Sequence, residues 1–363
     1  MTKILFDHQA FSMQRVGGIS RYFANIQKHL SQYTSLSFDR GVLFTNNAYI
    51  EEEKFPLPHW LLEPWYKRDK KIYKLNKKYA EYCLNSKGYD IFHPTYYDPY
   101  FLKIVKKPFV LTVHDFIHEL FPEYFPDTDG TVHNKRLLIE KASHFIAISE
   151  STKNDLQQIY KIPDSKISMI YHGFDNISLP ENAGASTPWS NYLLFVGDRW
   201  TYKNFFRWLQ AVAPLLIKYD INAVCAGGRP FSSAEMEFIE RLGIRNKITQ
   251  TRASENELRA LYRHTLLFIY PSLYEGFGLP ILEAFANNCP VAVSDTSCFK
   301  EVGGDAVLYF DPNSVESMRS VIEGFLTDSD KAGELRAAGT TRLAKFSMQK
   351  CMDQTVKVYQ SLV

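Results

Sequence analysis

The feature that most constrains the fold is an alternation of short apolar runs with amphipathic stretches, repeated along most of the 363 residues. Near-continuous apolar runs separated by helical patterns are typical of parallel strands in a sheet that helices cover on both faces. The runs that we predict as strands are 3–7, 35–45, 89–94, 108–115, 143–149, 166–173, 192–198, 221–227, 266–272, 290–295 and 306–312.

One segment, 178–191, interrupts this alternation. It has the sequence SLPENAGASTPWSN, which is rich in Pro, Gly, Ser and Ala, and we predict a linker there. A chain of 363 residues is also long for a single core. The pattern therefore predicts an α/β protein with two doubly wound, Rossmann-like domains, 1–180 and 181–345, whose parallel sheets face an interdomain cleft. Because ligands of such sheets bind beyond the carboxyl ends of the strands, the motifs there are the first site candidates.

The composition argues against several functions. Lys and Arg exceed Asp and Glu by only 42 to 40, which disfavours bulk binding of nucleic acid. The five cysteines are scattered and never spaced as Cys-x-x-Cys, so we expect reduced thiols rather than a disulfide framework or a zinc site. The start, MTKILFDHQ, lacks the apolar region of a signal peptide, and no run has the roughly 18 apolar residues of a membrane span. These features predict a cytoplasmic protein.

Two motifs of the first half follow predicted strands. Gly17 and Gly18 precede a predicted helix, where glycines let an anion approach the backbone, although a plain turn has the same sequence. His114 and Asp115 end a predicted strand. The imidazole there can donate to a substrate hydroxyl while the carboxylate sets its tautomer or its charge. The alternative for His114 is a core histidine whose nitrogens have partners within the protein.

Two cations follow the first predicted strand of the second half, in the sequence VGDRWTYKN. Arg199 and Lys203 lie beside the start of a predicted helix, an arrangement suited to a diphosphate leaving group whose oxygens gain charge in the transition state. A solvated charged loop is the alternative.

The stretch YEGFGLPILEAFA, later in the chain, places two glycines and two carboxylates between a strand and a helix. Gly276 and Gly278 clear space for a ligand beside backbone N–H groups. Glu275 in the loop and Glu283 in the first helical turn can accept hydrogen bonds from vicinal hydroxyls, which a sugar and a ribose both offer. The alternatives are an exposed loop charge for Glu275 and complementation of the helix dipole for Glu283.

These motifs occur together in one known family. YEGFGLPILEAFA resembles the E-x7-E motif of the retaining GT-B glycosyltransferases of family four, and GGISRY, VHD, HGFD and SCFKEVGGDAVLYFDP follow the order of that family. The resemblance covers essentially the whole chain. It implies an N-terminal domain on the acceptor side, a C-terminal domain that binds the nucleotide sugar, and a last helix, 346–363, that crosses back to the N-terminal domain. Asn288 stands where the family usually has Gly, and Asn tolerates the left-handed conformation of a helix cap.

The resemblance also implies roles for the residues above. Glu275 would bind hydroxyls of the donor sugar, and Glu283 the ribose. Arg199 and Lys203 would hold the diphosphate, and His114 would contact the donor sugar near the reaction centre. The other residues expected at the donor site are Gly17, Gly18, Asp115, Gly276, Phe277, Gly278 and Leu279.

The implied reaction moves a hexose from a nucleotide diphosphate sugar to a hydroxyl acceptor with retention at the anomeric carbon. Both motif glutamates are committed to hydroxyls, so we expect a reaction on one face in which the departing phosphate takes the proton of the acceptor. No cofactor or metal is expected, because the Asp-x-Asp sequences at 127–129 and 328–330 have polar, turn-like surroundings and are predicted to lie at the surface. A nucleotide-sugar epimerase of the same architecture and a non-catalytic sugar-nucleotide-binding protein remain as alternatives.

The sequences HDFIHELFPEYF and VGDRWTYKN resemble bacterial surface-polysaccharide transferases, such as O-antigen mannosyltransferases of lipopolysaccharide biosynthesis. That resemblance implies a mannose-type or 6-deoxyhexose donor, often GDP-linked, and a growing, lipid-linked saccharide as acceptor.

The segment 59–82 carries seven Lys or Arg residues against three acidic ones, interleaved with Trp and Tyr. It predicts either a helix with a solvated basic face or a peripheral contact with anionic lipid on the inner face of the plasma membrane.

Overall fold

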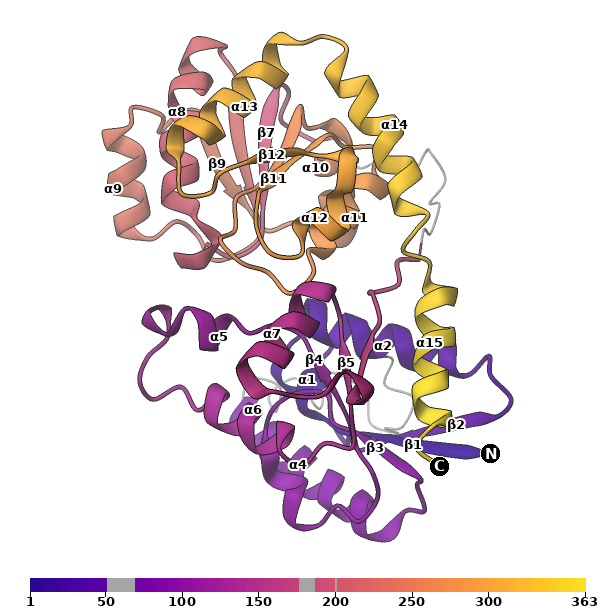
Figure 1. The fold of residues 1–363 in the computed structure, drawn as a ribbon. Helices are drawn as coiled ribbons and strands as arrows, with labels where there is room; N and C mark the ends of the chain where they lie inside the picture. The colour runs from indigo at the N-terminus through magenta and orange to yellow at the C-terminus, as the bar shows by residue number, and fades with distance from the viewer. Residues whose placement is uncertain (51–68, 176–186, 200) are drawn as a thin grey trace. The chain divides into compact units, whose positions relative to one another are not determined.

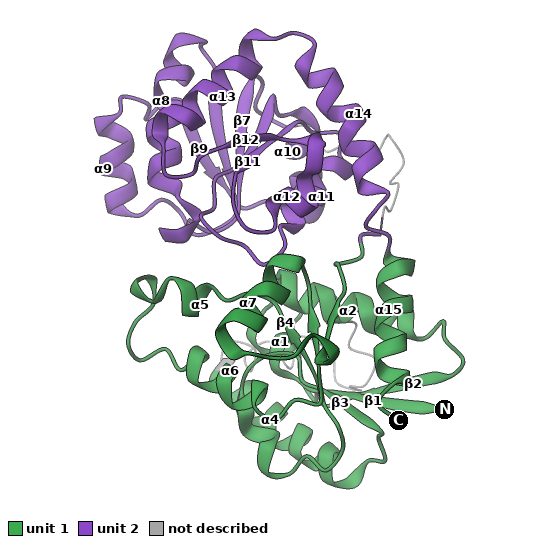
Figure 2. Cartoon of the chain, in the orientation of Figure 1, with its two compact units in different colours: residues 1–173, 348–363 green, residues 174–347 purple. Residues whose placement is uncertain are grey.

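The computed structural model of the chain describes residues 1–50, 69–175, 187–199 and 201–363. These residues form two compact units (Figure 2). Unit 1 comprises Met1–Gly173 and Met348–Val363, and unit 2 comprises Phe174–Ser347. Most of the predicted linker, and with it the predicted boundary between residues 180 and 181, lies outside the described residues.

The described strands of unit 1 are parallel and form two three-stranded sheets, ordered β2-β1-β3 and β4-β5-β6, which a bridge between Phe92 and Phe109 connects. Each strand lies within a run predicted as a strand, apart from the first residue of β1. The strands are β1 Thr2–Phe6, β2 Leu36–Arg40, β3 Ile91–His93, β4 Val110–Val113, β5 His144–Ala147 and β6 Ile167–Met169.

The α-helices among the described residues of unit 1 are α1 Gln9–Met13, α2 Gly18–Leu30, α4 Asp69–Ser86, α5 Ile117–Leu120, α6 Thr131–Ile139, α7 Glu150–Tyr160 and α15 Met348–Gln360. The helix α2 buries Tyr22, Phe23 and Ile26 on one face, at the spacing of an amphipathic helix. The helix α15 contacts α2 and contributes its apolar face to the same core (Figure 1). Although α15 follows the whole of unit 2 in the sequence, it is therefore part of unit 1.

The strands of unit 2 form one parallel sheet with the order β12-β11-β10-β7-β8-β9. They are β7 Tyr192–Val196, β8 Asn222–Ala226, β9 Ile248–Thr251, β10 Leu267–Tyr270, β11 Val291–Ser294 and β12 Leu308–Phe310. The chain winds outward from β7 to β9 and then returns to β10 on the other side of β7. This is the strand order of a doubly wound dinucleotide-type fold, as predicted, and its topological switch point lies between β7 and β10.

Helices cover both faces of this sheet, with α8 and α13 packed together on one face and α11 and α14 on the other (Figure 1). They are α8 Phe205–Lys218, α9 Ser233–Arg241, α10 Glu255–His264, α11 Leu279–Ala286, α12 Phe299–Gly303, α13 Val315–Thr327 and α14 Lys331–Leu343. Because parallel strands end at the same edge of a sheet, the loops after β7 and β10 meet at the switch point. The two motifs VGDRWTYKN and YEGFGLPILEAFA are those loops.

Candidate active site

Lys203 and Glu275 meet at the switch point of unit 2. Lys203 ends a short 3-10 turn, Thr201–Lys203, after β7, and Glu275 lies in the loop after β10. The ammonium Nζ is 2.5 Å from Glu275 Oε1, and each side chain is 15% exposed. A half-buried ion pair open to solvent on one side can exchange either partner for groups of a ligand. The structure thus brings together two residues that the sequence predicted for one site.

Two tyrosines, neither of them predicted for the site, lie beside this ion pair. The ammonium of Lys203 lies 5.4 Å from the ring centre of Tyr270 and 5.2 Å from that of Tyr202. Tyr270 is buried at the end of β10. Burial raises the pKa of its phenol well above the ordinary value, and so does the carboxylate of Glu275, to which the hydroxyl is hydrogen-bonded. Tyr270 therefore stays protonated and holds Glu275 as a donor.

The loop 275–279 reaches its helix through Gly278, the N-cap of α11. Gly278 has φ +100°, and a Cβ atom there would lie 3.0 Å from the ring of Phe299. Both the left-handed backbone and the close contact require glycine. Gly276 is also buried, and Leu279 is half-buried at the start of α11, whereas the side chain of Phe277 packs on Phe346. Phe277 can therefore contact a ligand through its backbone rather than through its ring.

Glu283, the second predicted carboxylate, is the fifth residue of α11 and is half-buried. The expectation that it lies in the first helical turn is wrong, because α11 begins at Leu279 and has no acidic residue in its first turn. Complementation of the helix dipole is correspondingly disfavoured, since that effect fades within one turn. The hydroxyl of Tyr262, from α10, donates to Glu283 Oε2 at 3.3 Å and orients the carboxylate.

Arg199 is not part of the Lys203 cluster. Its Nε donates to Glu235 Oε1 at 2.6 Å, and its other nitrogens donate to the backbone oxygens of Gly227, Arg229 and Pro230. The side chain is 5% exposed. The guanidinium is thus occupied with the loop after β8, and its predicted contact with a diphosphate would require most of these bonds to change. Glu235 could not be predicted as its partner, because that residue lies 36 positions further along the chain, in α9.

The predicted residues of the first half belong to unit 1. His114 follows β4 and is 6% exposed, and its Nε2 has no hydrogen-bond partner in the described part of the chain. Its ring lies edge-on to Tyr22, with centres 5.6 Å apart, and 6.5 Å from the nearly parallel ring of His172. Burial, and next the cation of Lys135, lower the pKa of His114 to about 3. The imidazole is therefore neutral at pH 7, with a free nitrogen.

Asp115 has a different role from the one expected. Its carboxylate accepts the backbone N–H of Ile117, the first residue of α5, at 3.1 Å. Its backbone oxygen accepts from Lys135, a fully buried lysine that also pairs with Glu119 at 2.9 Å. The predicted influence of Asp115 on the charge of His114 is therefore not seen, and Lys135 exerts the electrostatic effect instead.

Gly17 is the N-cap of α2 and has an extended backbone, so no strain requires glycine there. A Cβ atom there would lie 2.4 Å from the side-chain oxygen of Gln14. That oxygen accepts the N–H of Ser20, in the first turn of α2. Gly17 thus leaves room for a glutamine amide to cap α2, the helix that begins at Gly18 and carries Tyr22.

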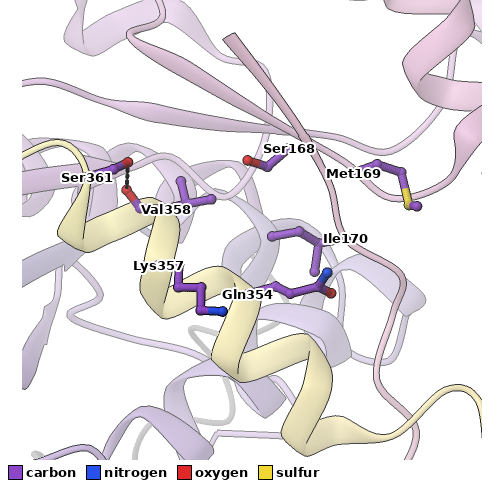
Figure 3. Close-up of a pocket in the computed structure, with 7 residues that line it drawn as sticks. All are labelled: Ser168, Met169, Ile170, Gln354, Lys357, Val358 and Ser361. Carbon is purple, nitrogen blue, oxygen red and sulfur yellow. Dashed lines mark hydrogen bonds between the residues drawn. The ribbon is translucent and has the colours of Figure 1, made fainter. Parts of the chain in front are cut away.

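A cavity of about 350 Å³ opens elsewhere in unit 1, between β6 and α15 (Figure 3). Its lining comprises Ser168, Met169, Ile170, Gln354, Lys357, Val358 and Ser361. None of the predicted site residues lines it.

The described residues contain no group of three or more His, Cys, Asp or Glu side chains that could hold a metal ion. Asp127, Asp328 and Asp330 of the Asp-x-Asp sequences are exposed, as predicted, and Asp129 is half-buried. Among the described helices, none has the length and apolar character to cross a membrane.

Comparison with known proteins gives a family for each half of the chain. Residues 16–176 match the model of Glycosyltransferase Family 4, and residues 183–342 match that of Glycosyl transferases group 1. The O-antigen chain mannosyltransferase RfbU of Salmonella typhimurium is 30% identical over 212 residues, 57% of this chain and 59% of that protein. The O-antigen chain mannosyltransferase B of Escherichia coli is 27% identical over 338 residues, 89% of this chain and 83% of that protein.

Solved structures share the fold over the whole chain. Sucrose-phosphate synthase of Thermosynechococcus elongatus superposes with a TM-score of 0.72 at 17% identity, covering 100% of this chain and 99% of that one. Anabaena HepE, in complex with UDP-glucose, superposes with a TM-score of 0.71 at 18% identity, covering 100% of both chains. These likenesses establish a GT-B fold. The two family models, one for each half, show that the chain is a glycosyltransferase with this fold.

Proposed function

We propose that this glycosyltransferase moves a mannose-type hexose from a GDP-linked donor to a hydroxyl of a growing, lipid-linked bacterial polysaccharide. In this proposal, the reaction retains the configuration of the anomeric carbon and needs no metal. The observation that carries the proposal is the Lys203–Glu275 pair at the switch point of unit 2. A cation next to a carboxylate offers one group for a phosphate and one for sugar hydroxyls. The choice of mannose is supported by the O-antigen mannosyltransferases among the relatives.

In the proposed reaction, the ammonium of Lys203 faces the diphosphate and stabilises the charge that develops on it as the anomeric bond breaks. Glu275 accepts hydrogen bonds from donor-sugar hydroxyls, and Tyr270 holds its carboxylate in place. Without a ligand, Lys203 and Glu275 neutralise each other. The acceptor oxygen bonds to the anomeric carbon on the face that the phosphate leaves, and its proton passes to the departing phosphate.

Two other residues take supporting roles in this proposal. Glu283, oriented by Tyr262, accepts hydrogen bonds from the ribose. Arg199 acts through the backbone, because its bonds fix the loop 227–230 beside the site. The contact of His114 with the donor sugar stays a prediction.

A transfer assay tests the proposal directly. The protein is incubated with GDP-mannose labelled in the sugar, with and without lipid-linked saccharide from a bacterium whose surface polysaccharide contains mannose. We expect label in the lipid fraction only when the acceptor is present, the same amount in the presence of EDTA, and an α-linkage in the product. Release of an isomerised nucleotide sugar without acceptor would indicate the epimerase instead. Binding of GDP-mannose without any turnover would indicate the non-catalytic protein.

The nucleotide is tested separately by thermal shift with GDP, UDP, dTDP and ADP, because only a nucleotide that binds the folded protein raises its melting temperature. We expect the largest shift with GDP. A larger shift with UDP would overturn the GDP-linked donor and leave glycosyl transfer intact.

The exposed face of α4 supports a further part of the proposal, contact with an anionic membrane. Residues 59–68 of the basic segment lie outside the described residues, whereas the rest forms most of α4. Lys71, Lys74 and Lys78 are exposed at the spacing of one helix face, and Leu75 and Tyr82, 37% and 61% exposed, lie along it. Cations interleaved with apolar groups are typical of helices that lie on anionic lipid.

Sedimentation with vesicles tests this contact. We expect binding to phosphatidylglycerol vesicles and not to phosphatidylcholine vesicles. Replacing the three exposed lysines of α4 with Glu should abolish binding, whereas a control with the same charge change at Lys103, Lys106 and Lys107, also exposed in unit 1, should retain it. Equal binding by both triple variants would refute a specific role of α4.

A further inference from the structure

Four consecutive residues, 296–299, contact the loop that carries Glu275. They are the last three residues of the turn after β11 and the first residue of α12. The strands β10 and β11 are parallel neighbours, so the turn after one lies beside the loop after the other. We propose that these four residues, here termed the loop brace, are positioning residues that hold Glu275 in the geometry required to recognise the donor sugar. The inference rests on the function proposed above.

Each residue of the loop brace makes a contact of its own. Thr296 Oγ1 donates to the backbone oxygen of Leu273 at 3.0 Å, and Ser297 Oγ accepts the backbone N–H of Glu275 at 3.4 Å. The thiol of Cys298 faces two backbone oxygens, at 3.2 Å for Glu275 and 3.0 Å for Phe277. The ring of Phe299 packs on Gly278 and lies 4.9 Å from the ring of Tyr270.

These contacts differ from ordinary packing in what they fix. Three of the four are side-chain hydrogen bonds to the backbone on either side of Glu275, in a loop that belongs to neither a helix nor a strand. Cys298 is fully buried, and burial raises the pKa of its thiol well above the ordinary value, so that the thiol keeps its proton for donation. Ser297 has φ +39°, an uncommon conformation for a residue with a side chain. Such a backbone persists where the surrounding contacts determine it.

The contacts of the loop brace predict which ligand should bind more weakly when they are removed. Glu275 faces sugar hydroxyls in the proposed site, whereas Glu283, which faces the ribose, is held separately by Tyr262. A displaced Glu275 should therefore weaken binding of a nucleotide sugar and leave binding of the nucleoside diphosphate unchanged. A general loss of stability would affect both ligands.

The experiment uses two matched pairs of variants on the full chain. Thr296→Val and Cys298→Ala remove a hydrogen-bond donor of the loop brace, and Thr296→Ser and Cys298→Ser keep it. Thr265→Val is the control, because the hydroxyl of Thr265 donates to the backbone oxygen of Tyr192 at 2.8 Å just before β10, at the opposite end of that strand. All five are compared with the wild type by calorimetry with GDP and with GDP-mannose, and by hydrogen exchange of the peptide 273–279 without ligand.

We expect Thr296→Val and Cys298→Ala to bind GDP-mannose about tenfold more weakly and GDP as the wild type does. Both should show faster exchange in 273–279, and the two serine variants and Thr265→Val should show neither change. Unchanged exchange in that peptide would overturn the loop brace, whatever the donor is.

Two further outcomes separate the loop brace from the proposed function. Faster exchange with undiminished GDP-mannose affinity would overturn its role in sugar recognition. Faster exchange in a protein whose wild type binds no GDP-mannose would support the loop brace as a structural device and refute the proposed donor.

Discussion

Both units place polar side chains at the carboxyl ends of parallel strands, but these side chains differ in charge and in burial. In unit 2, the loops at the carboxyl ends of β7 and β10 place a charged pair, Lys203 and Glu275, where both side chains keep some exposure. In unit 1, the corresponding ends of β4 and β6 lead to His114 and His172, which are almost fully buried beside Tyr22. Parallel sheets therefore bring residues of several strand ends together in both units, and the residues placed there decide whether the surface offers charge.

The difference teaches how each unit can meet a ligand. The ion pair of unit 2 can exchange its partners for phosphate and hydroxyl groups, since both side chains keep some exposure. Three histidines of unit 1 are neutral, because burial lowers the pKa of His93, His114 and His172 to about 3 in each case. Of these, His114 has a ring nitrogen without a hydrogen-bond partner in the described part of the chain, so it can bond to a ligand without adding charge. Five predictions test this contrast.

The largest effect should come from acid, and it should fall on unit 1. An unfolded histidine has a pKa near 6.5, well above the folded values, so below pH 6.5 the unfolded chain binds more protons and stability falls as the pH drops towards 3. At pH 5 this amounts to about 2 kcal/mol for each of the three histidines. Hydrogen exchange at pH 7 and pH 5, corrected for intrinsic rates, should show protection lost in unit 1 and kept in unit 2, whose His264 is exposed. Equal loss in both units would contradict the contrast.

The second prediction removes the cation of unit 2. Lys203→Ala should lower kcat by a few hundredfold, about 3 to 4 kcal/mol, because one preorganised charge on the leaving group is lost. Lys203→Arg, which keeps the charge in another shape, should recover part of the rate. The measurement is the initial rate of transfer from GDP-mannose. An undiminished rate in Lys203→Ala would show that this ammonium does not stabilise the leaving group.

The third prediction separates Arg199 from Lys203. Arg199→Lys cannot reproduce the bonds to Glu235 and to three backbone oxygens, so we expect a loss of about 2 kcal/mol in unfolding free energy. Its kcat should change only severalfold. Chemical denaturation and the transfer assay measure the two quantities. A large loss of kcat at unchanged stability would instead support a direct contact of Arg199 with the diphosphate.

The fourth prediction breaks the ion pair from the other side. Glu275→Gln removes the charge of the carboxylate and leaves Lys203 without its partner, so kcat/KM should fall by about 30-fold, or about 2 kcal/mol. Binding of GDP alone should hold or strengthen, because the freed ammonium has only the diphosphate to pair with. Calorimetry with GDP tests that sign, and weaker GDP binding would show that Glu275 serves the nucleotide instead.

The smallest effect is expected for Tyr270. Tyr270→Phe keeps the ring beside Lys203 and removes one hydrogen bond to Glu275, a change of about 1 kcal/mol and about fivefold in kcat/KM. Tyr192→Phe is a suitable control, since its hydroxyl donates to the backbone oxygen of Leu261, away from the site. Equal losses in the two variants would show that the hydroxyl of Tyr270 acts only on stability.

The fold was largely predictable, because all but one of the described strands lie almost entirely within runs that their apolar residues predict as strands. The exception is β9, Ile248–Thr251, whose sequence ITQT has a single apolar residue. It lies at the edge of the sheet and needs little burial, so hydrophobicity did not reveal it. At Asn288, the local rule held: φ is +55°, the left-handed conformation expected where the family has glycine.

In the candidate site, the residues that belong to a sequence motif could be predicted. Lys203 and Glu275 were found because each follows a strand, and the topology brings those two strand ends together. The partners that orient such residues come from distant segments without a motif of their own. Glu235 for Arg199, Tyr262 for Glu283 and Lys135 near His114 are examples. Tyr270 had a usable signal, a polar-tipped aromatic residue as the last residue of a buried strand.

The place of α15 in unit 1 has a consequence for synthesis on the ribosome. Tyr359 of α15 bonds to His93 at 2.7 Å, so the core of unit 1 closes around a helix that is translated after all of unit 2. Unit 2 is one uninterrupted stretch and can fold as soon as it has emerged. Until α15 has been translated, the apolar side chains that it covers in the first 173 residues stay exposed. Those residues are thus the part of the polypeptide for which chaperone capture during translation matters most.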